Sequence, residues 1–242
     1  MNIDLAITGP TAGVLFLATI VHAIGGFGFA QVSMSLLPYI RDPASATILF
    51  TVAALFCNSI VFYSVREEFR WSDYNTPAKG LILGLPVGLL FFHQLNSGQL
   101  KTAIWLTVGL SIIITLYAKK TGQLDKQYVK KQDNGKPAIA AGFLSGILGG
   151  AVAIPSPPMV VYAAYMKLAG RWDTRRIKAM LTAYSGTLML FRLIAVAYAG
   201  TASTSIMLET LFLLPALLLG ALIGFSLINQ FQETRIHTPA SC

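Results

Sequence analysis

Charge is scarce in this 242-residue chain: Asp, Glu, Lys and Arg make up 12% of it, against 55% hydrophobic residues. Its three histidines and two cysteines, Cys57 and Cys242, offer neither a metal-ligand spacing nor a disulfide framework. The acidic residues form no pair within an apolar segment, so the carboxylate relay of many proton pumps is absent. This composition, with a mean hydropathy of +0.64, predicts a polytopic membrane protein without a metal ion or a cofactor.

Sequence motifs of hydrolytic enzymes are absent as well. The chain has no phosphate-binding GxxxxGK[ST], no zinc-binding HExxH and no GxSxG. The net charge of +8 is a weak argument for nucleic acid, because a basic excess beside apolar spans more often reports orientation in the membrane. We therefore expect neither an enzyme nor a nucleic-acid-binding protein.

An apolar stretch of similar design occurs twice. The first runs over residues 11–40 around Gly25-Gly26-Phe27-Gly28, and the second over residues 138–166 around Gly149-Gly150 and Pro155-Ser156-Pro157-Pro158. One crossing needs roughly 20 apolar residues, so each stretch is too long for one crossing and too short for two. We interpret both as broken, re-entrant helical hairpins, whose non-helical tips must pack in protein or line a polar cavity. Ten ordinary short helices are the alternative.

Basic residues predict the orientation. Five further segments are expected to cross the membrane: 44–64, 77–95, 99–118, 175–199 and 206–228. The linker 119–136 and the connector 167–178 are rich in Lys and Arg, which places both in the cytoplasm. Threading the chain from these anchors leaves only Arg41, Lys101 and Arg192 off the cytoplasmic side. This threading predicts a protein of the plasma (inner) membrane, with the N-terminus outside and the C-terminus inside.

Counting crossings predicts the symmetry. Three crossings separate the hairpins, so the first opens outward, the second opens inward, and the two halves are inverted repeats. The expected fold is an all-α polytopic membrane protein of two inverted repeats, each beginning with a broken hairpin. Residues 1–118 hold the first repeat and one extra crossing helix, 119–136 the basic linker, and 137–242 the second repeat. Inverted repeats with opposed broken helices are a recurring basis of alternating access.

The hairpin tips are the predicted substrate site. A half-helix that begins at a tip presents unpaired N–H groups and a positive dipole end, which attract an anion. Side chains near these starts are Gln31 and Ser33 in the first hairpin and Ser156 in the second, beside the pairs Gly25-Gly26 and Gly149-Gly150. In the alternative interpretation, Gly and Pro only let the helices pack closely and kink.

Polar residues within the spans extend this site. Arg192 is the charged residue well inside a span, where it either binds substrate or snorkels to the nearby interface. Thr182 and Ser185 share its helical face, and Asn58 is the strongest polar candidate in the corresponding segment of the first half, unless it only bonds a neighbouring helix. His22 and His93 could couple transport to protons, although a lone histidine is more often simply hydrogen-bonded.

Two segments carry a family resemblance: Gly25-Gly26-Phe27-Gly28 with Ser35-Leu36-Leu37-Pro38, and more specifically residues 142–150 with Pro157-Pro158-Met159-Val160-Val161-Tyr162. In these segments the chain resembles the sulfite exporter TauE/SafE family of bacterial anion permeases. The resemblance implies a secondary transporter of a small anion, such as sulfite, sulfoacetate or a related organosulfonate. An anion channel and a non-transporting membrane subunit or receptor are the alternatives. The expected partners are the anion and the lipid bilayer, and the apolar spans are also compatible with a homodimer.

Overall fold

The structure, a computed structural model, describes residues 5–120, 135–201 and 204–237. These residues form nine α-helices and one 3-10 helix, and the described ranges contain no β-strand. In chain order the elements are α1 (Leu5–Gly25), α2 (Phe29–Ile40), α3 (Pro43–Tyr63), η1 (Arg66–Glu68), α4 (Trp71–Gln94), α5 (Ser97–Lys120), α7 (Lys136–Val152), α8 (Ser156–Leu168), α9 (Thr174–Tyr198) and α10 (Thr204–His237). The predicted all-helical class is confirmed.

Among the described residues, five helices are long and apolar enough to cross a membrane: α1, α3, α4, α9 and α10. Helices α2 and α8 have only 12 and 13 residues and are too short to do so. Four of the predicted crossing segments coincide with α3, α4, α9 and α10, and the fifth lies in α5. The chain is therefore a multi-pass membrane protein. The predicted linker 119–136 lies mostly outside the described residues, and the division into repeats stays a prediction.

Two helices extend well beyond the predicted crossing segments, because α10 ends at His237 and not at residue 228, and α4 begins before its predicted segment. α4 begins at Trp71 and not at Pro77, because the polar residues 71–76 continue the helix ahead of the proline. Asp73 in the first turn of α4 favours this start, since a negative side chain stabilises the positive N-terminal end of a helix. The cytoplasmic loop predicted between the first two crossings is correspondingly shorter and contains η1.

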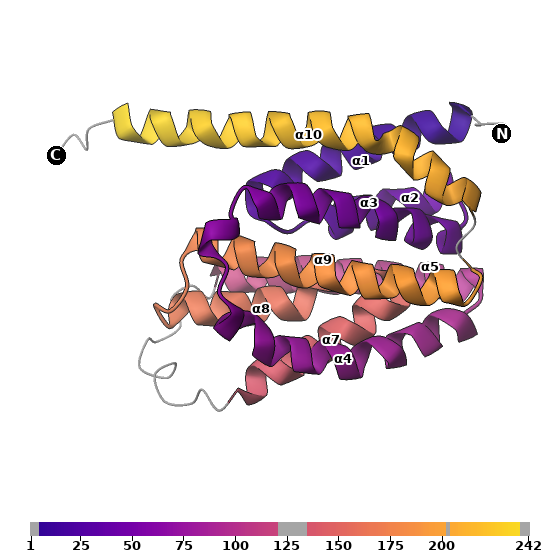
Figure 1. The fold of residues 1–242 in the computed structure, drawn as a ribbon, viewed down its shortest axis with the longest axis horizontal. Helices are drawn as coiled ribbons and strands as arrows, with labels where there is room; N and C mark the ends of the chain where they lie inside the picture. The colour runs from indigo at the N-terminus through magenta and orange to yellow at the C-terminus, as the bar shows by residue number, and fades with distance from the viewer. Residues whose placement is uncertain (1–4, 121–134, 202–203, 238–242) are drawn as a thin grey trace.

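Packing joins helices that are far apart in sequence. Figure 1 shows α1 with α10 on one side of the molecule, α4 with α7 on the other, and α3 and α9 between them. The α4–α7 contact is a seam of facing glycines, where a Cβ added to Gly88 would lie 2.9 Å from Cα of Gly150. Small residues permit this close approach, which is how helices associate where water supplies no hydrophobic drive.

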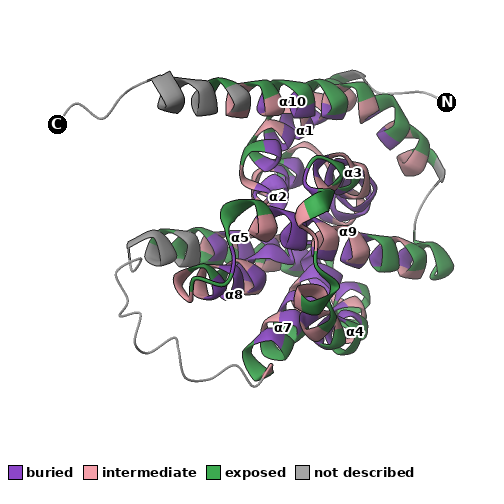
Figure 2. Ribbon diagram, turned by 60° about the vertical axis from the view of Figure 1, so that its left-hand side comes forward, coloured by how far each residue is buried: buried purple, intermediate pink, exposed green. Residues whose placement is uncertain are grey.

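Exposed apolar side chains cover the outward surfaces. Figure 2 shows exposed residues along the outer faces of α10 and α4, while buried residues gather around α3 and α9. Leu218, Leu219 and Leu222 on α10 are exposed by 50% or more. In water such a surface would be unfavourable, whereas lipid tails solvate it without cost. The surface therefore agrees with the membrane assignment.

Both apolar stretches are broken within the segments predicted from Gly and Pro. α1 ends at Gly25 and α2 begins at Phe29, so the first break falls on the glycine motif. In the second hairpin, Gly149 and Gly150 remain helical, and the chain breaks after Val152, at residues 153–155. The second half-helix begins at Ser156, within the predicted start near residues 155–159. Gly150 packs against α4, and that packing stabilises the helical backbone there.

Candidate functional site

The first hairpin tip is built from glycines in left-handed conformations. Gly26 has φ +73° and Gly28 has φ +107°, values that residues with a side chain rarely adopt. A Cβ added to Gly26 would also overlap the side chain of Lys178 on α9. Gly28 precedes α2 without a capping side chain, so the first N–H groups of α2 are open to another acceptor.

The second tip reaches a similar shape with different residues. Ala153 adopts φ +61° without being glycine, and α8 begins at Ser156 with Pro157 in its first turn. A proline there loses no helical hydrogen bond. Ser145 of α7 donates a hydrogen bond to the carbonyl of Pro155, which ties the tip to the preceding helix.

The two tips meet at one small cavity, which we call the central cavity. Its volume is about 20 Å³, which is room for one water molecule. Its lining combines both tips with the middle of α3 and α9: His22, Phe27, Gly28, Phe29, Ala30, Phe50, Ala54, Asn58, Pro155, Ser156, Ser185 and Met189. The N-terminal ends of α2 and α8 therefore converge on one site, although they lie more than a hundred residues apart.

Unpaired polar atoms line the central cavity. Asn58 is buried and donates its amide to the carbonyl of Ala54 at 2.7 Å, while its Oδ1 has no hydrogen-bond partner within the described residues. His22 is also buried, and neither ring nitrogen has a partner in that part of the chain. Because a buried unpaired polar atom costs free energy, such atoms need an explanation, and a bound ligand would provide one.

Two buried cations flank the central cavity along α9. Lys178 lies seven residues before Ser185 and Arg192 lies seven residues after it, so all three side chains share one helical face. Each cation is about 10 Å from Ser185 along the helix axis. Lys178 is 8% exposed and Arg192 is fully buried. No Asp or Glu is buried in the described ranges, so this site has a net positive charge.

Each cation holds the end of one broken helix. Lys178 donates to the carbonyl of Ala23, two residues before the end of α1. Arg192 donates through Nε to the carbonyl of Gly150, at 3.1 Å and two residues before the end of α7. The last carbonyls of a helix lack helical partners and carry the negative dipole end, which a cation stabilises.

Arg192 is fully buried inside the protein and does not reach the membrane interface, and two of its three guanidinium nitrogens donate hydrogen bonds. Its Nη1 donates to the carbonyl of Thr47 at 3.2 Å and to Oγ1 of Thr51. The guanidinium carbon lies 4.8 Å from the ring centroid of Phe92, and Nη2 has no hydrogen-bond partner within the described residues. Arg192 thus connects the polar face of α9 with Thr47 and Thr51 of α3.

The structure gathers some of the predicted site residues and separates others. Four of them line the central cavity: His22, Asn58, Ser156 and Ser185. Gly26 contacts Lys178, and Gly149 packs against Leu188. The other predicted residues lie outside the cavity lining: Gly25, Gly26, Gln31, Ser33, Gly149, Gly150, Thr182 and Arg192. His93 is exposed at the end of α4, away from this cavity.

A groove of about 430 Å³ adjoins Asn58 on the side of η1 and the start of α4. Thr182 and Gly186 of α9 line this groove, together with aromatic residues such as Phe62 and Tyr74. Asn58 borders both the groove and the central cavity, so its amide stands between them.

Sequence reasoning missed Lys178. Lys178 was counted only among the basic residues of the connector 167–178, whereas the structure shows it in α9 with a buried side chain. The seven-residue spacing to Ser185 was the signal that could have revealed it, because residues seven apart share a helical face.

The chain is similar to known proteins over most of its length. The model of the family described as sulfite exporter TauE/SafE matches residues 11–239. The chain is also 22% identical over 189 residues to NADH-quinone oxidoreductase subunit M of Rickettsia conorii (strain ATCC VR-613 / Malish 7) and 23% identical over 192 residues to that of Rickettsia prowazekii (strain Madrid E). Each alignment covers 74% of this chain but only 37% of the relative's length. No solved structure matches.

Proposed function

Because the chain belongs to the sulfite exporter TauE/SafE family of membrane transporters, we propose that it is a secondary transporter of a small sulfur-containing anion. Sulfite, sulfoacetate and related organosulfonates are the candidate substrates. The observation that carries the proposal is the convergence of two helix N-termini on a cavity between Lys178 and Arg192. Both helix ends and both cations favour a negative ligand, and no carboxylate is buried beside them in the described ranges.

Individual side chains have separate roles in this proposal. The N–H groups at the start of α2 and α8 bind the anion, Ser156 adds a hydroxyl donor, and Ser185 borders the ligand from α9. Oδ1 of Asn58 accepts a hydrogen bond from a protonated ligand such as hydrogensulfite, or from His22. His22 is the candidate for proton coupling, because it lines the cavity. The position of His93 offers no support for such a role.

Alternating access is supported by the reciprocal packing of the two halves. The first helix of each hairpin packs on the late helix of the other half, α1 on α10 and α7 on α4. One constant step along the chain carries Asp73 to Glu209, Gly84 to Gly220 and Gly88 to Gly224. These correspondences are expected of inverted repeats, which would open one hairpin to each side of the membrane in turn.

Ion pairs at both ends of the molecule fit such a cycle. Arg41, at the end of α2, binds Glu209 of α10 through two contacts of 2.9 and 3.1 Å. Arg176 at the start of α9 binds Asp73 of α4 through contacts of 2.5 and 2.8 Å. Only the Arg176–Asp73 pair is bidentate through two nitrogens, since Arg41 uses Nη2 alone. In the proposed mechanism these ion pairs hold the two ends closed, and each breaks when its own side opens.

The central cavity is too small for a sulfonate, so the described conformation is an occluded one in this proposal. The groove beyond Asn58 supplies the route to one side of the membrane, which the charge pattern predicts to be the cytoplasm. Movement of the Asn58 amide and of α9 at Gly186 would join the groove to the cavity, because a Cβ on Gly186 would lie only 3.5 Å from that of Asn58.

A flux assay with the purified full chain tests the proposal. Proteoliposomes should take up one or more of sulfite, thiosulfate, sulfoacetate, taurine and sulfate, with saturation and against a gradient when a driving ion is supplied. Flux that never saturates would instead indicate a channel. Absence of flux for the whole panel, from folded protein, would favour a subunit or receptor.

Ser156→Asp tests the site itself. The new carboxylate stands where the anion should bind, so transport and binding should be lost, while Ser156→Ala should cost only a neutral hydrogen bond of about 0.5–1.5 kcal/mol. Asn75→Asp is the matched control, because it adds the same charge at an exposed position near the start of α4. Wild-type uptake by folded Ser156→Asp would remove the central cavity as the anion site.

A further inference from the structure

The groove of about 430 Å³ beyond Asn58 has walls that suit hydrocarbon better than a bare anion. None of the described residues that line it is charged. The hydroxyls of Ser59, Thr182 and Thr187 each donate to a backbone carbonyl of their own helix. Because a hydroxyl has one hydrogen to donate, these three have none left for an anion. Aliphatic and aromatic side chains make up most of the remaining lining.

An aromatic cluster lines part of this groove. The ring centroid of Phe69 lies 5.5 Å from that of Phe62, 5.1 Å from that of Trp71 and 5.7 Å from that of Tyr74. All four residues belong to the lining. Their mutual edge contacts hold the rings in place, so an apolar group that binds against them orders few further side chains.

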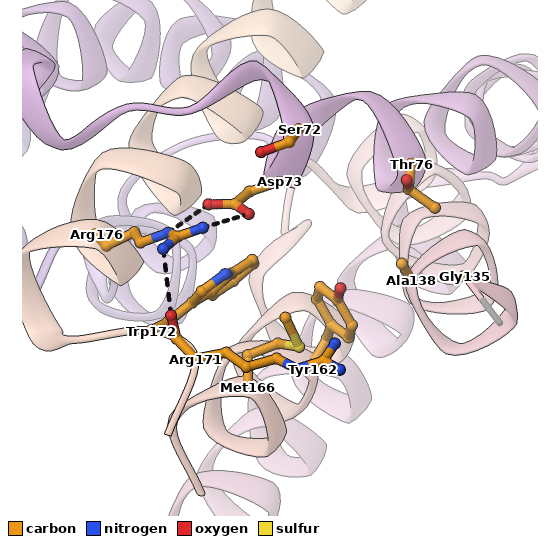
Figure 3. A pocket seen from close by; sticks show the side chains of 10 residues that line it. All are labelled: Ser72, Asp73, Thr76, Gly135, Ala138, Tyr162, Met166, Arg171, Trp172 and Arg176. Atoms are coloured by element: carbon orange, nitrogen blue, oxygen red, sulfur yellow. Dashed lines mark hydrogen bonds and ion pairs between the residues drawn. The ribbon is translucent and has the colours of Figure 1, made fainter. Parts of the chain in front are cut away.

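A charged cavity lies on another face of the first turns of α4. It measures about 350 Å³, and Figure 3 shows the Arg176–Asp73 ion pair within it. Trp71 and Tyr74, three residues apart, share a helical face and line the groove, whereas Ser72 and Asp73 line the charged cavity. The same short stretch of α4 therefore separates a charged environment from an uncharged, apolar one.

We propose that the groove binds the hydrocarbon part of the transported anion, so that the protein selects sulfonates with an alkyl or aryl group of several carbons over sulfite and sulfate. The inference rests on the proposed function, because the sulfonate head is taken to bind at the helix N-termini of the central cavity. Asn58 borders both spaces, which places the groove directly beside that head. Its volume is within the usual range of small-molecule sites.

A series of alkanesulfonates tests the groove. Equilibrium binding of methane-, propane- and hexanesulfonate to the detergent-purified full chain should tighten about fourfold for each added methylene that the groove buries. Ala183→Leu places a larger side chain in the groove, so it should remove this gain and leave the affinity for methanesulfonate unchanged. Ala197→Leu is the matched control, because Ala197 is exposed on the same helix and does not line the groove.

Three outcomes would overturn the inference. Wild-type affinity could be independent of chain length, or Ala183→Leu could retain the gain. Phospholipid that copurifies with wild type and Ala197→Leu but not with Ala183→Leu would assign the groove to a lipid acyl chain instead. Should Ala183→Leu fail to fold, Trp71→Ala removes an aromatic wall at a position that is 66% exposed, and it should weaken binding of hexanesulfonate but not of methanesulfonate.

Flux measurements separate this inference from the proposed function. Saturable uptake of methanesulfonate and hexanesulfonate with equal affinities would keep the transport function and overturn the role of the groove. Binding that tightens with chain length and loses this gain in Ala183→Leu, in a protein that transports no member of the series, would refute the transport function and keep the groove as a site for the hydrocarbon chain.

Discussion

The two hairpin tips reach the same arrangement by different means. The first uses Gly26 and Gly28 at positive φ, with Lys178 on the last carbonyls of α1. The second uses Ala153 at positive φ and a proline-rich start of α8, with Arg192 on the last carbonyls of α7. Two features are common to both tips. The helix before the break ends at a buried cation, which binds its negative C-terminal end. The helix after the break begins at the central cavity, toward which its positive N-terminal end points.

This difference shows which features the site requires. Glycine is one way to turn the chain, and a strained alanine followed by proline is another. A buried cation occurs at both tips, because each broken helix leaves carbonyls that lipid cannot hydrate. The feature that both tips repeat is thus a buried cation at the end of the broken helix, and α9 provides that cation for both hairpins.

We predict that the two hairpins open to opposite sides of the membrane. Thiol labelling from one side tests this, because a cysteine on that side reacts and one on the other side does not. In a Cys242→Ser background, Thr201→Cys should react with an impermeant thiol reagent added outside, and Asn75→Cys should not. Thr201 follows α9 and Asn75 lies beyond α3, so this result places the second hairpin opening inside and the first outside. Cys57 is buried and serves as the internal negative control. Reaction of both positions from the same side would exclude inverted hairpins.

The flanking cations should have large effects on anion affinity. A unit charge about 10 Å from the ligand is worth about 1.7 kcal/mol at an effective dielectric of 20, so Lys178→Met should weaken binding more than tenfold. Arg192→Gln should weaken it further, because it also releases Gly150, Thr47 and Thr51. Arg192→Lys keeps the charge but loses the planar fork, and should lie between Gln and wild type.

Equilibrium binding of sulfite or sulfoacetate to detergent-purified variants measures these effects. Lys79→Met is the control, since Lys79 is exposed on α4. Wild-type affinity in Arg192→Gln would leave the anion to the helix N-termini and Lys178 alone. Equal affinity in Lys178→Met and wild type would show that Lys178 does not contribute to anion binding and would leave Arg192 as the contributing cation of α9.

The smallest effects concern the backbone of the tips. Gly26→Ala should lower the free energy of unfolding by about 1–3 kcal/mol, because it forces a side chain into a left-handed conformation and against Lys178. Ala153→Gly should change stability by about 1 kcal/mol or less, since relieved strain offsets the added freedom of the unfolded chain. Thermal unfolding in detergent compares the two. A larger loss in Ala153→Gly than in Gly26→Ala would contradict the roles assigned to the two tips.

Several features of the site were readable from local sequence. Gly and Pro inside long apolar runs marked the breaks, because such residues interrupt helices where lipid allows no other structure. Ser156 and Ser185, along with His22 and Asn58, were identified as polar groups in apolar segments, and all four line the central cavity. Burial of polar groups is unfavourable enough that their type and position already indicate a site.

Other features depended on contacts that no local pattern encodes. Gly149 and Gly150 lie inside α7, where Gly150 packs closely on α4, a contact that no local pattern reveals. The sequence grouped Lys178 with the basic connector, and its role is apparent only from its hydrogen bond to the carbonyl of Ala23 in α1. The cavity of about 350 Å³ lined by Ser72, Tyr162 and Trp172 requires α4, α7, α8 and α9 together, so no local pattern reveals it.

By itself the sequence determined that the chain is helical, apolar, multi-pass and interrupted twice, since hydropathy and helix-breaking residues act over a few neighbouring positions. Tertiary structure decided which cations are buried and which carbonyl groups they bind. Those outcomes depend on carbonyls of Ala23 and Gly150 meeting α9 across 155 and 42 positions of sequence. Hydrogen bonding and close packing across such separations follow from the three-dimensional arrangement of the helices, which is why only the folded chain reveals them.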